Sequence, residues 1–315
     1  MNFNRMITRL GFAAAAVVPL LTSAGTPPAP ADAVQRVLNK LTNVVILYAE
    51  NRSFDNLYGL FPGANGLTHA TPDTYRQADR DGTILPSLPP VWKSDGTPDR
   101  NYPTNMPNQP FRIDQPPVNS PLTTATRDLV HRFYQNQEQI NGGKLNRYAA
   151  VSDAGGLVMG YYDGSVLPLW KLAQQYTLAD NFFMGAFGGS LLNHFWLICA
   201  CSPTFSNAPK SLIEQVNANG QLLRRSTSPA SALDGPPQYL GNSSVTTDGY
   251  AVNTLIVSPL VKKRNIDHTL LDTTSILKFI TRKFDLEPLP GVRKEVGDLT
   301  STLDPAALDP APPPH

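Results

Sequence analysis

The chain has 315 residues, of which 41% are hydrophobic and 16% are charged, and its formal net charge is +1. That length suffices for one large domain or two small ones. The near-neutral charge, without a basic stripe, excludes an electrostatic case for nucleic-acid binding. The chain holds 30 prolines, many of them in residues 27–30, 86–121 and 305–314, which we expect to form extended loops or tails.

Residues 1–33 have the pattern of a secretory signal peptide. Two arginines precede an apolar stretch at 10–21, and small residues follow it. The apolar stretch is short for a membrane span. Candidate cleavage points follow Ala24 and Ala33, and an uncleaved anchor is the alternative. We therefore predict an exported protein, periplasmic or secreted, without a stable membrane span once the signal is removed.

The next segments predict a helix, a strand and a long irregular excursion. Residues 33–42 favour a short helix that leads into the domain. The run NVVILYA at 43–49 is apolar at every position from 44 to 47, which is typical of a buried strand in a parallel sheet. Residues 59–121 carry many Gly, Pro, Asn and Asp residues with little periodicity. We expect this excursion to be ordered but irregular and to border a site.

Two helices and a strand follow the excursion. One helix is expected at about 126–139, ending before Asn-Gly-Gly. The other is expected at 168–175, with Pro168 in its first turn. A buried strand at 176–180 then leads into a Gly-Gly-Ser turn and an apolar helix.

The C-terminal part predicts one more strand and one more helix. Residues 253–261 favour the strand, and residues 272–284 favour an amphipathic helix with Asp272 as its N-cap. This alternation of helices and strands predicts an α/β fold with a mainly parallel sheet flanked by helices. In such sheets, ligand sites lie beyond the carboxyl ends of the strands.

Two polar features fall just past predicted strand ends. Glu50 and Asn51 offer hard oxygen ligands for a divalent cation, or they form a turn that meets backbone amides. Ser190 follows two glycines at a helix N-terminus, where partial positive charge favours an alkoxide or a phosphate. It is a candidate nucleophile or a plain N-cap.

Two histidines are further candidates. His131 lies on the predicted helix at 126–139, and His194 follows Ser190 by four residues, on the same side of its helix. Each is either a functional residue or a hydrogen-bonded structural one. The two cysteines, Cys199 and Cys201, are expected to be buried free thiols, because side chains one residue apart do not easily form an unstrained bridge.

Several stretches resemble one family, the bacterial phosphoesterases that include secreted acid phosphatases and phospholipases C. The resemblance is strongest to the acid-phosphatase branch. It rests on five stretches: VVILYAENRSFDNLYGLFPGANGL, HRFYQNQEQINGGKLNRY, SDAGGLVMGYYD, LADNFFMGAFGGSLLNHFWLICAC and DHTLLDTTSILKFITRKFDLEPLPGVR. They cover most of residues 42–201 and 250–300.

The resemblance implies an alkaline-phosphatase-like α/β core and the hydrolysis of phosphate esters, either phosphomonoesters or phospholipids. It implies that Glu50 and Asn51 bind a divalent metal ion. Ser190 would be both a metal ligand and the nucleophile, and His131 would help to hold the phosphate. His194 is a possible supporting residue, since without the metal no other activator of the serine is visible in the sequence.

The chain departs from the family pattern most seriously at one place, with smaller departures at Asn146, Leu191 and Phe195. Family members carry a long segment, ending in an Asp-Glu metal pair, between a DGYAVNT-like motif and an LIVSP-like strand. Here residues 248–254 run directly into residues 255–261, and the chain has no Asp-Glu pair. We therefore expect one domain at 34–300 with an internal deletion near 254/255, and a proline-rich tail at 301–315.

The deletion predicts weakened metal binding, exposed apolar strand edges, and marginal stability or dependence on a partner. The alternative to an active enzyme is an inactive or weakened remnant. An artefact at the 254/255 junction is a further alternative, which resequencing of the locus would reveal.

Overall fold

The computed structural model describes residues 31–202, 215–216, 222–224 and 253–308. The predicted signal peptide therefore lies, except for its last three residues, outside the described part. The described helices and strands are α1 (Ala31–Lys40), α2 (Phe54–Tyr58), α3 (Pro72–Tyr75), α4 (Phe133–Ile140), α5 (Tyr148–Val151), α6 (Pro168–Gln175), α7 (Ser190–Cys199), α8 (Thr273–Phe284), β1 (Phe111–Arg112), β2 (Gly160–Tyr161), β3 (Thr177–Ala179), β4 (Phe182–Phe183), β5 (Gln215–Val216), β6 (Leu222–Arg224), β7 (Thr254–Ile256), β8 (Asn265–Asp267) and β9 (Leu271–Asp272).

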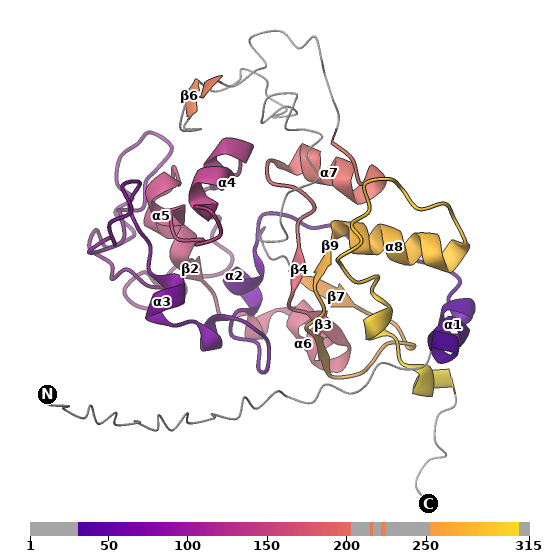
Figure 1. Ribbon diagram of the computed structural model, residues 1–315. Coiled ribbons are helices and arrows are strands. Elements are labelled where there is room, and N and C mark those ends of the chain that lie inside the picture. Colours follow the sequence, from indigo (N-terminus) through magenta and orange to yellow (C-terminus); the bar gives the residue numbers. More distant parts are fainter. Residues whose placement is uncertain (1–30, 203–214, 217–221, 225–252, 309–315) are drawn as a thin grey trace, which may run out of the picture.

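Strand β3 lies at the centre of a three-stranded sheet in the order β7–β3–β8 (Figure 1). It pairs in parallel with β8, with Ala179 opposite Asp267, and antiparallel with β7. Strands β4 and β9 form a further parallel pair. The predicted α/β fold with helices around the strands is confirmed. Its sheets are small and mixed, because β7 runs against β3.

Helices α7 and α8 pack against each other beside these strands, and α1 lies next to the far end of α8 (Figure 1). Helix α6 has the predicted bounds and carries Pro168 at its start. Helix α8 begins with the predicted cap. The Asp272 carboxylate accepts the Thr274 backbone N–H at 2.7 Å, and the Ser275 hydroxyl accepts the Asp272 N–H at 3.0 Å. Strong local signals therefore fixed these helices.

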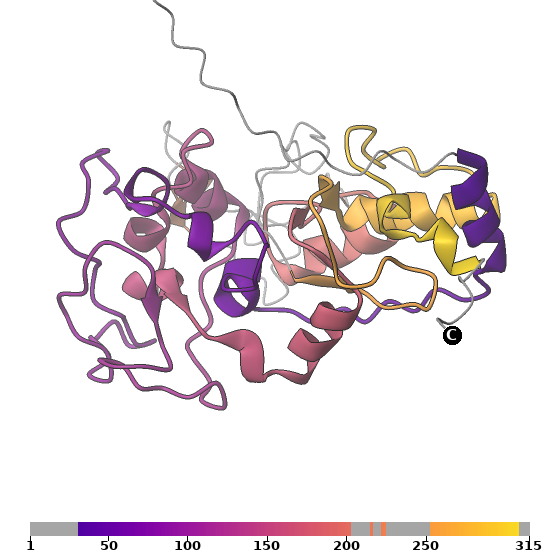
Figure 2. The same ribbon diagram turned by 90° about the horizontal axis from the view of Figure 1, so that it is seen from below.

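The excursion at 59–121 is ordered and largely irregular, as predicted. Its apolar side chains join those of α5 and of the chain around β2 in a core cluster that includes Leu88, Ile113 and Tyr162. Figure 2 shows this part, coloured purple, beside the part of the chain that carries α7 and α8. At the other end of the chain, Leu303 is 4% exposed and bridges to Val261. The predicted tail at 301–315 thus packs on the core from its start as far as residue 308.

The expected strand at 43–49 is wrong, since the segment is extended but forms no strand. Val44 packs on the core cluster around α1 and α8, whereas Val45 and Leu47 are 80% and 91% exposed. No backbone hydrogen bond joins residues 43–50 to the rest of the described chain. An apolar segment forms a β-strand only where a neighbouring strand pairs with its backbone, and the described residues offer no such neighbour here.

The predicted helix at 126–139 begins later, at Phe133. Tertiary hydrogen bonds hold the preceding residues in extended form. The Arg127 guanidinium donates to the carbonyls of Trp92 and Asp153, and the Asp153 carboxylate accepts the Val130 N–H at 2.9 Å. The end of α4 at Asn141, whose φ is 48°, lies where the sequence predicted it.

The expectation of buried free thiols is also wrong. Cys199 and Cys201 form a disulfide and lie at the surface or half-buried. Ala200 between them has φ 47° and ψ 41°, a left-handed conformation that folds the chain back. The two Cα atoms are therefore 5.1 Å apart, within the usual range for a disulfide. Among the described residues, no helix has the length and apolar character needed to cross a membrane.

Candidate active site

Glu50 and His194 meet at the first turns of α7. The Oε1 atom of Glu50 lies 2.9 Å from Nε2 of His194, and the two side chains are 26% and 47% exposed. The residues are 144 positions apart in the sequence. Glu50 is followed by the candidate Asn51, and His194 follows the candidate Ser190 by four residues on α7. The extended segment at 43–50 thus delivers its terminal carboxylate to the helix that begins with the serine.

Tyr48 holds the other side of the histidine ring. Its ring makes an edge-on contact with His194, with centroids 5.1 Å apart and planes at 65°. Its hydroxyl donates to the Met184 sulfur at 3.5 Å. Burial, with a contribution from the Glu50 charge, raises the pKa of Tyr48 to about 12, so the phenol stays protonated at neutral pH. The imidazole is therefore fixed on two sides, by a carboxylate and by an aromatic ring.

Ser190 is the first residue of α7 and is half-buried. The glycine before its N-cap, Gly188, has φ 137°, which side chains rarely adopt. Two asparagine side chains hold this turn. Asn193 accepts the Ala186 N–H at 3.1 Å, and Asn136 of α4 accepts the Gly188 N–H at 3.1 Å. The serine thus stands on a backbone fixed from two helices.

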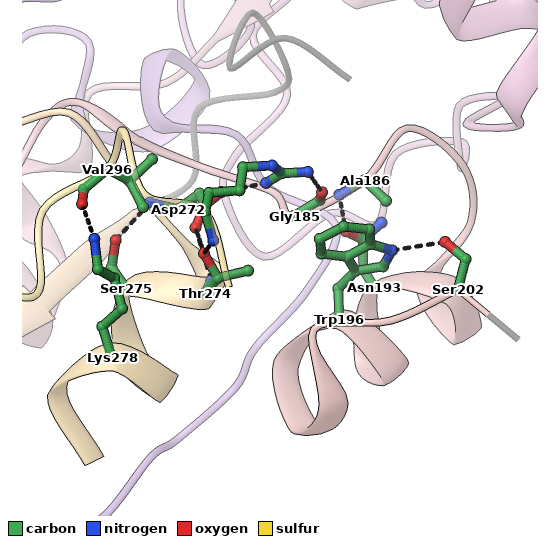
Figure 3. A network of polar contacts seen from close by, with 11 residues as sticks. Gly185, Ala186, Asn193, Trp196, Ser202, Asp272, Thr274, Ser275, Lys278 and Val296 are labelled. Carbon is green, nitrogen blue, oxygen red and sulfur yellow. Dashed lines mark hydrogen bonds and ion pairs between the residues drawn. The ribbon is translucent and has the colours of Figure 1, made fainter. Parts of the chain in front are cut away.

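A buried arginine fixes the start of the same loop, and Figure 3 labels three residues that it contacts, Gly185, Trp196 and Asp272. The Arg293 guanidinium pairs with the Asp272 carboxylate, donates to the Gly185 carbonyl, and lies over the Trp196 ring at 4.5 Å. Trp196 in turn donates to the Ser202 hydroxyl at 3.0 Å. The cap of α8 is therefore joined through one cation to both the loop before Ser190 and the middle of α7.

The other two candidates, Asn51 and His131, are held by contacts of their own backbone neighbourhood. Asn51 is exposed and has φ 75°, a left-handed conformation that asparagine tolerates, so it forms the sharp turn that leads to α2. His131 is not on a helix. Its Nδ1 lies 2.6 Å from the Leu129 carbonyl, two residues before α4 begins. No described contact joins either side chain to Ser190, although α4 itself reaches the turn through Asn136.

A divalent metal ion needs more donors than these residues bring together. The described part of the chain contains no group of three His, Cys, Asp or Glu side chains placed to hold a metal. Glu50 is the one carboxylate among the candidates, and its Oε1 is engaged by His194. Hard divalent ions take six or more oxygen ligands and favour several negative charges. The donor set of Glu50, Asn51 and Ser190 therefore does not fit such an ion.

A second carboxylate–histidine pair lies in the sheet, where β3 and β8 end. The Asp180 Oδ2 atom lies 2.8 Å from Nδ1 of His268 and accepts the Asn65 N–H at 2.7 Å. Asp180 is fully buried, whereas the His268 side chain is 62% exposed. A small pocket of about 210 Å³, lined by Leu60, Tyr75 and Tyr161 among others, involves none of the candidate residues.

Sequence reasoning missed the residues that hold the site in place. Asn193 could have been found from the sequence, because it is a polar residue in a largely apolar helix. In the structure it is 1% exposed, and a buried polar side chain needs a partner. Asn136, also buried, lies on a helix that the sequence placed too early. Arg293 gave no local signal, since its partners are far away in the sequence.

These contacts define an α/β protein in which a glycine–serine turn and a carboxylate–imidazole pair meet at one helix end. A model of the Phosphoesterase family matches residues 41–232 and 225–287, which together make up well over half of the chain. The chain therefore belongs to the Phosphoesterase family, as the sequence resemblance indicated.

Curated relatives of this chain include two phospholipases C of Mycobacterium tuberculosis. Phospholipase C A is 26% identical over 231 residues, which are 68% of this chain and 40% of that protein. Phospholipase C B is 23% identical over 208 residues, which are 62% of this chain and 36% of that protein. The chain thus spans about two fifths of the length of these relatives.

Proposed function

We propose that this chain is an exported hydrolase of phosphate esters, with Ser190 as its nucleophile. The observation that carries the proposal is the position of the serine. Within a chain matched by the Phosphoesterase family, it begins α7 at the point where Glu50 and His194 meet. Phosphoryl transfer depends chiefly on positioning and on stabilising negative charge. A fixed serine at a helix N-terminus contributes to both.

The substrate is proposed as a phosphomonoester or a phospholipid. The resemblance to acid phosphatases favours the first, and the printed names of the two relatives favour the second. His131 is proposed to help hold the phosphate. What supports this role is its position just before α4, the helix whose Asn136 holds the turn ahead of Ser190.

Metal assistance, which the resemblance implies, would require ligands beyond Glu50, Asn51 and Ser190. Each absent carboxylate is worth roughly 4 kcal/mol of attraction to a neighbouring charge at an intermediate dielectric. The described donors do not fit a divalent ion.

A second candidate function is that of a weakened or inactive remnant. The exposed Val45 and Leu47 favour it, since they lack the neighbouring strand that an apolar run requires. The family match in two segments also supports a chain that lacks part of the family domain.

The test is hydrolysis by the purified protein and its Ser190→Ala variant. The substrates would be p-nitrophenyl phosphate, bis-p-nitrophenyl phosphate and phosphatidylcholine vesicles. An active enzyme releases product from at least one of them, and Ser190→Ala abolishes that release. A protein that is folded by circular dichroism yet inert on all three would support the remnant instead.

Export is proposed from the N-terminal pattern and is tested separately. Helix α1 begins at Ala31 and buries Val37 and Leu38 completely. Cleavage after Ala24 would leave this helix whole, whereas cleavage after Ala33 would remove its first residues. Cell fractionation followed by N-terminal sequencing of the mature protein distinguishes these sites from an uncleaved anchor.

A further inference from the structure

We infer that the Cys199–Cys201 disulfide is a modification site, at which an external thiol or dithiol exchanges with the exposed sulfur of Cys201. The inference does not depend on the proposed hydrolase activity, because it concerns the opposite end of α7 from Ser190. The chain holds 2 cysteines, and both take part in this one bond. Thiol chemistry of the protein's own side chains is therefore confined to this place.

A purely structural role explains this disulfide poorly. A disulfide stabilises a fold mainly by restricting the unfolded chain, and the effect falls as the enclosed loop becomes shorter. Here a single residue, Ala200, separates the two cysteines, so the unfolded chain loses little freedom. The core also does not cover the bond, since Cys201 is exposed and Cys199 is half-buried. Exposed disulfides are the ones that react readily with external thiols.

The disulfide holds the end of α7 in a conformation that alanine alone disfavours. Ala200 has φ 47° and ψ 41°, in the left-handed region, which costs free energy for a residue with a Cβ atom. The Ala200 carbonyl packs so closely on Gly291 that a Cβ atom there would collide with its oxygen. Opening of the disulfide therefore removes a restraint on Ala200 and on its contact with the chain after α8.

The same turn is connected to the contacts that hold α7 in place. Ser202, one residue after Cys201, accepts the Trp196 indole N–H at 3.0 Å (Figure 3). The face of the Trp196 ring carries the Arg293 guanidinium, which also donates to the Gly185 carbonyl. A change at the disulfide therefore reaches the Trp196 ring first, which makes this tryptophan a reporter of the exchange.

The exchange is balanced in electrons and protons. The thiolate of a dithiol attacks the Cys201 Sγ atom, the bond to the Cys199 Sγ atom breaks, and Cys199 leaves with the electron pair. The negative end of the α7 dipole disfavours a thiolate there, so Cys199 takes a proton from water. The second thiolate of the reagent then attacks the reagent's own sulfur in the mixed disulfide, and Cys201 leaves and is protonated. The chain gains two electrons and two protons, and the dithiol is oxidised to a disulfide.

The test is the reduction of the folded, full chain by dithiothreitol. Samples would be quenched with iodoacetamide, and intact mass spectrometry would count the alkylated cysteines. We expect the native chain to react within about tenfold of its rate in unfolding urea, because the bond is exposed. A disulfide that reacts only when the chain unfolds would be slower by about 10³-fold or more, the usual equilibrium constant for unfolding. Oxidised glutathione, reduced in both solutions, corrects for the effect of urea on the chemistry.

A monothiol identifies the sulfur that is attacked. Brief treatment with reduced glutathione, followed by iodoacetamide, should leave glutathione on Cys201 and the alkyl group on Cys199. Peptide mapping by mass spectrometry would show this placement.

Tryptophan fluorescence and melting curves report what the opening does to α7. The chain holds 3 tryptophans, so reduction should change the fluorescence of the wild type and leave that of Trp196→Phe unchanged. The melting temperature should fall on reduction by about 2–8 °C, the cost of one alanine held in the left-handed region. The matched control is the double variant Cys199→Ser/Cys201→Ser, which should not respond to dithiothreitol.

Four results would overturn the inference. They are two free thiols in a chain purified in air without reductant, a native rate more than about tenfold below the rate in urea, glutathione found on Cys199, and unchanged fluorescence and melting after complete reduction. Each measurement is made without a phosphate ester, so an inactive hydrolase would leave all four readouts intact.

Discussion

The ion pair between Arg293 and Asp272 is expected to be essential for stability. Their side chains are 8% and 1% exposed. Arg293→Met would leave the Asp272 charge buried with no countercharge, and it would remove a donor from the Gly185 carbonyl and the cation from the Trp196 face. Breaking a buried pair by removing one partner costs about 3–5 kcal/mol. At about 2–4 °C per kcal/mol for a chain of this size, the melting temperature should fall by about 6–20 °C.

The assays are thermal unfolding, which gives the melting temperature, and urea unfolding, which gives the free energy of unfolding. Both are followed by far-UV circular dichroism, with tryptophan fluorescence as a second probe. Asp272→Asn should also destabilise the fold, because it leaves the Arg293 charge buried with no countercharge. Only the charge is lost in this variant, since asparagine can still cap α8. The control is Arg282→Met. That arginine pairs with Asp298 at 2.7 Å with 37% and 23% of the side chains exposed, so its loss should cost about 0–1 kcal/mol. Equal effects of Arg293→Met and Arg282→Met would refute the reasoning.

Three further predictions follow from burial, exposure and close packing. Desolvation raises the pKa of Asp55 to about 6 although the residue is solvent-accessible. Its ionisation therefore weakens the fold as the pH rises from about 4 through 6. At pH 7.5, Asp55→Asn should be more stable than the wild type by under about 1 kcal/mol after screening, and should melt at a higher temperature. At pH 4 the two proteins should melt at the same temperature. The double substitution of Val45 and Leu47 by Lys should suppress aggregation, measured by light scattering, and should lower the free energy of unfolding by no more than about 0.5 kcal/mol. The control is Val166→Lys, at a similarly exposed site away from that segment, which should leave aggregation unchanged. Gly291→Ala should lower the melting temperature, because a Cβ there would collide with the Ala200 carbonyl oxygen; an unchanged melting curve would contradict the close approach.

The elements predicted well are those with their own local signals. Pro168 and Asp272 mark helix starts that short-range geometry fixes. The elements predicted poorly depend on distant partners. The start of α4 is displaced by hydrogen bonds from Arg127 and Asp153, and the run at 43–49 lacks a strand to pair with. Local pattern cannot report such partners.

The same division holds for the candidate site. The four-residue spacing of Ser190 and His194 on one helix was readable from the sequence. The contact of His194 with Glu50 was not, because it joins segments 144 residues apart, and neither was the anchoring by Arg293. The family resemblance named Glu50 as a metal ligand, which stays a prediction, and in the structure the carboxylate's partner is an imidazole.

The position of Glu50 does not depend on the strand that failed to form. Before Glu50, Tyr48 contacts the Met184 sulfur and the His194 ring. After Glu50, the Arg52 guanidinium donates to the Asn56 side chain at 3.1 Å, and the Arg52 carbonyl accepts from the Asn253 side chain at 3.3 Å. A segment anchored on both sides keeps its carboxylate at α7 even where its backbone lacks a sheet partner. Loss of a neighbouring strand would therefore expose Val45 and Leu47 while leaving the Glu50–His194 contact intact. This separation allows the chain to expose Val45 and Leu47 and still hold the Glu50 carboxylate against His194 of the helix that begins with Ser190.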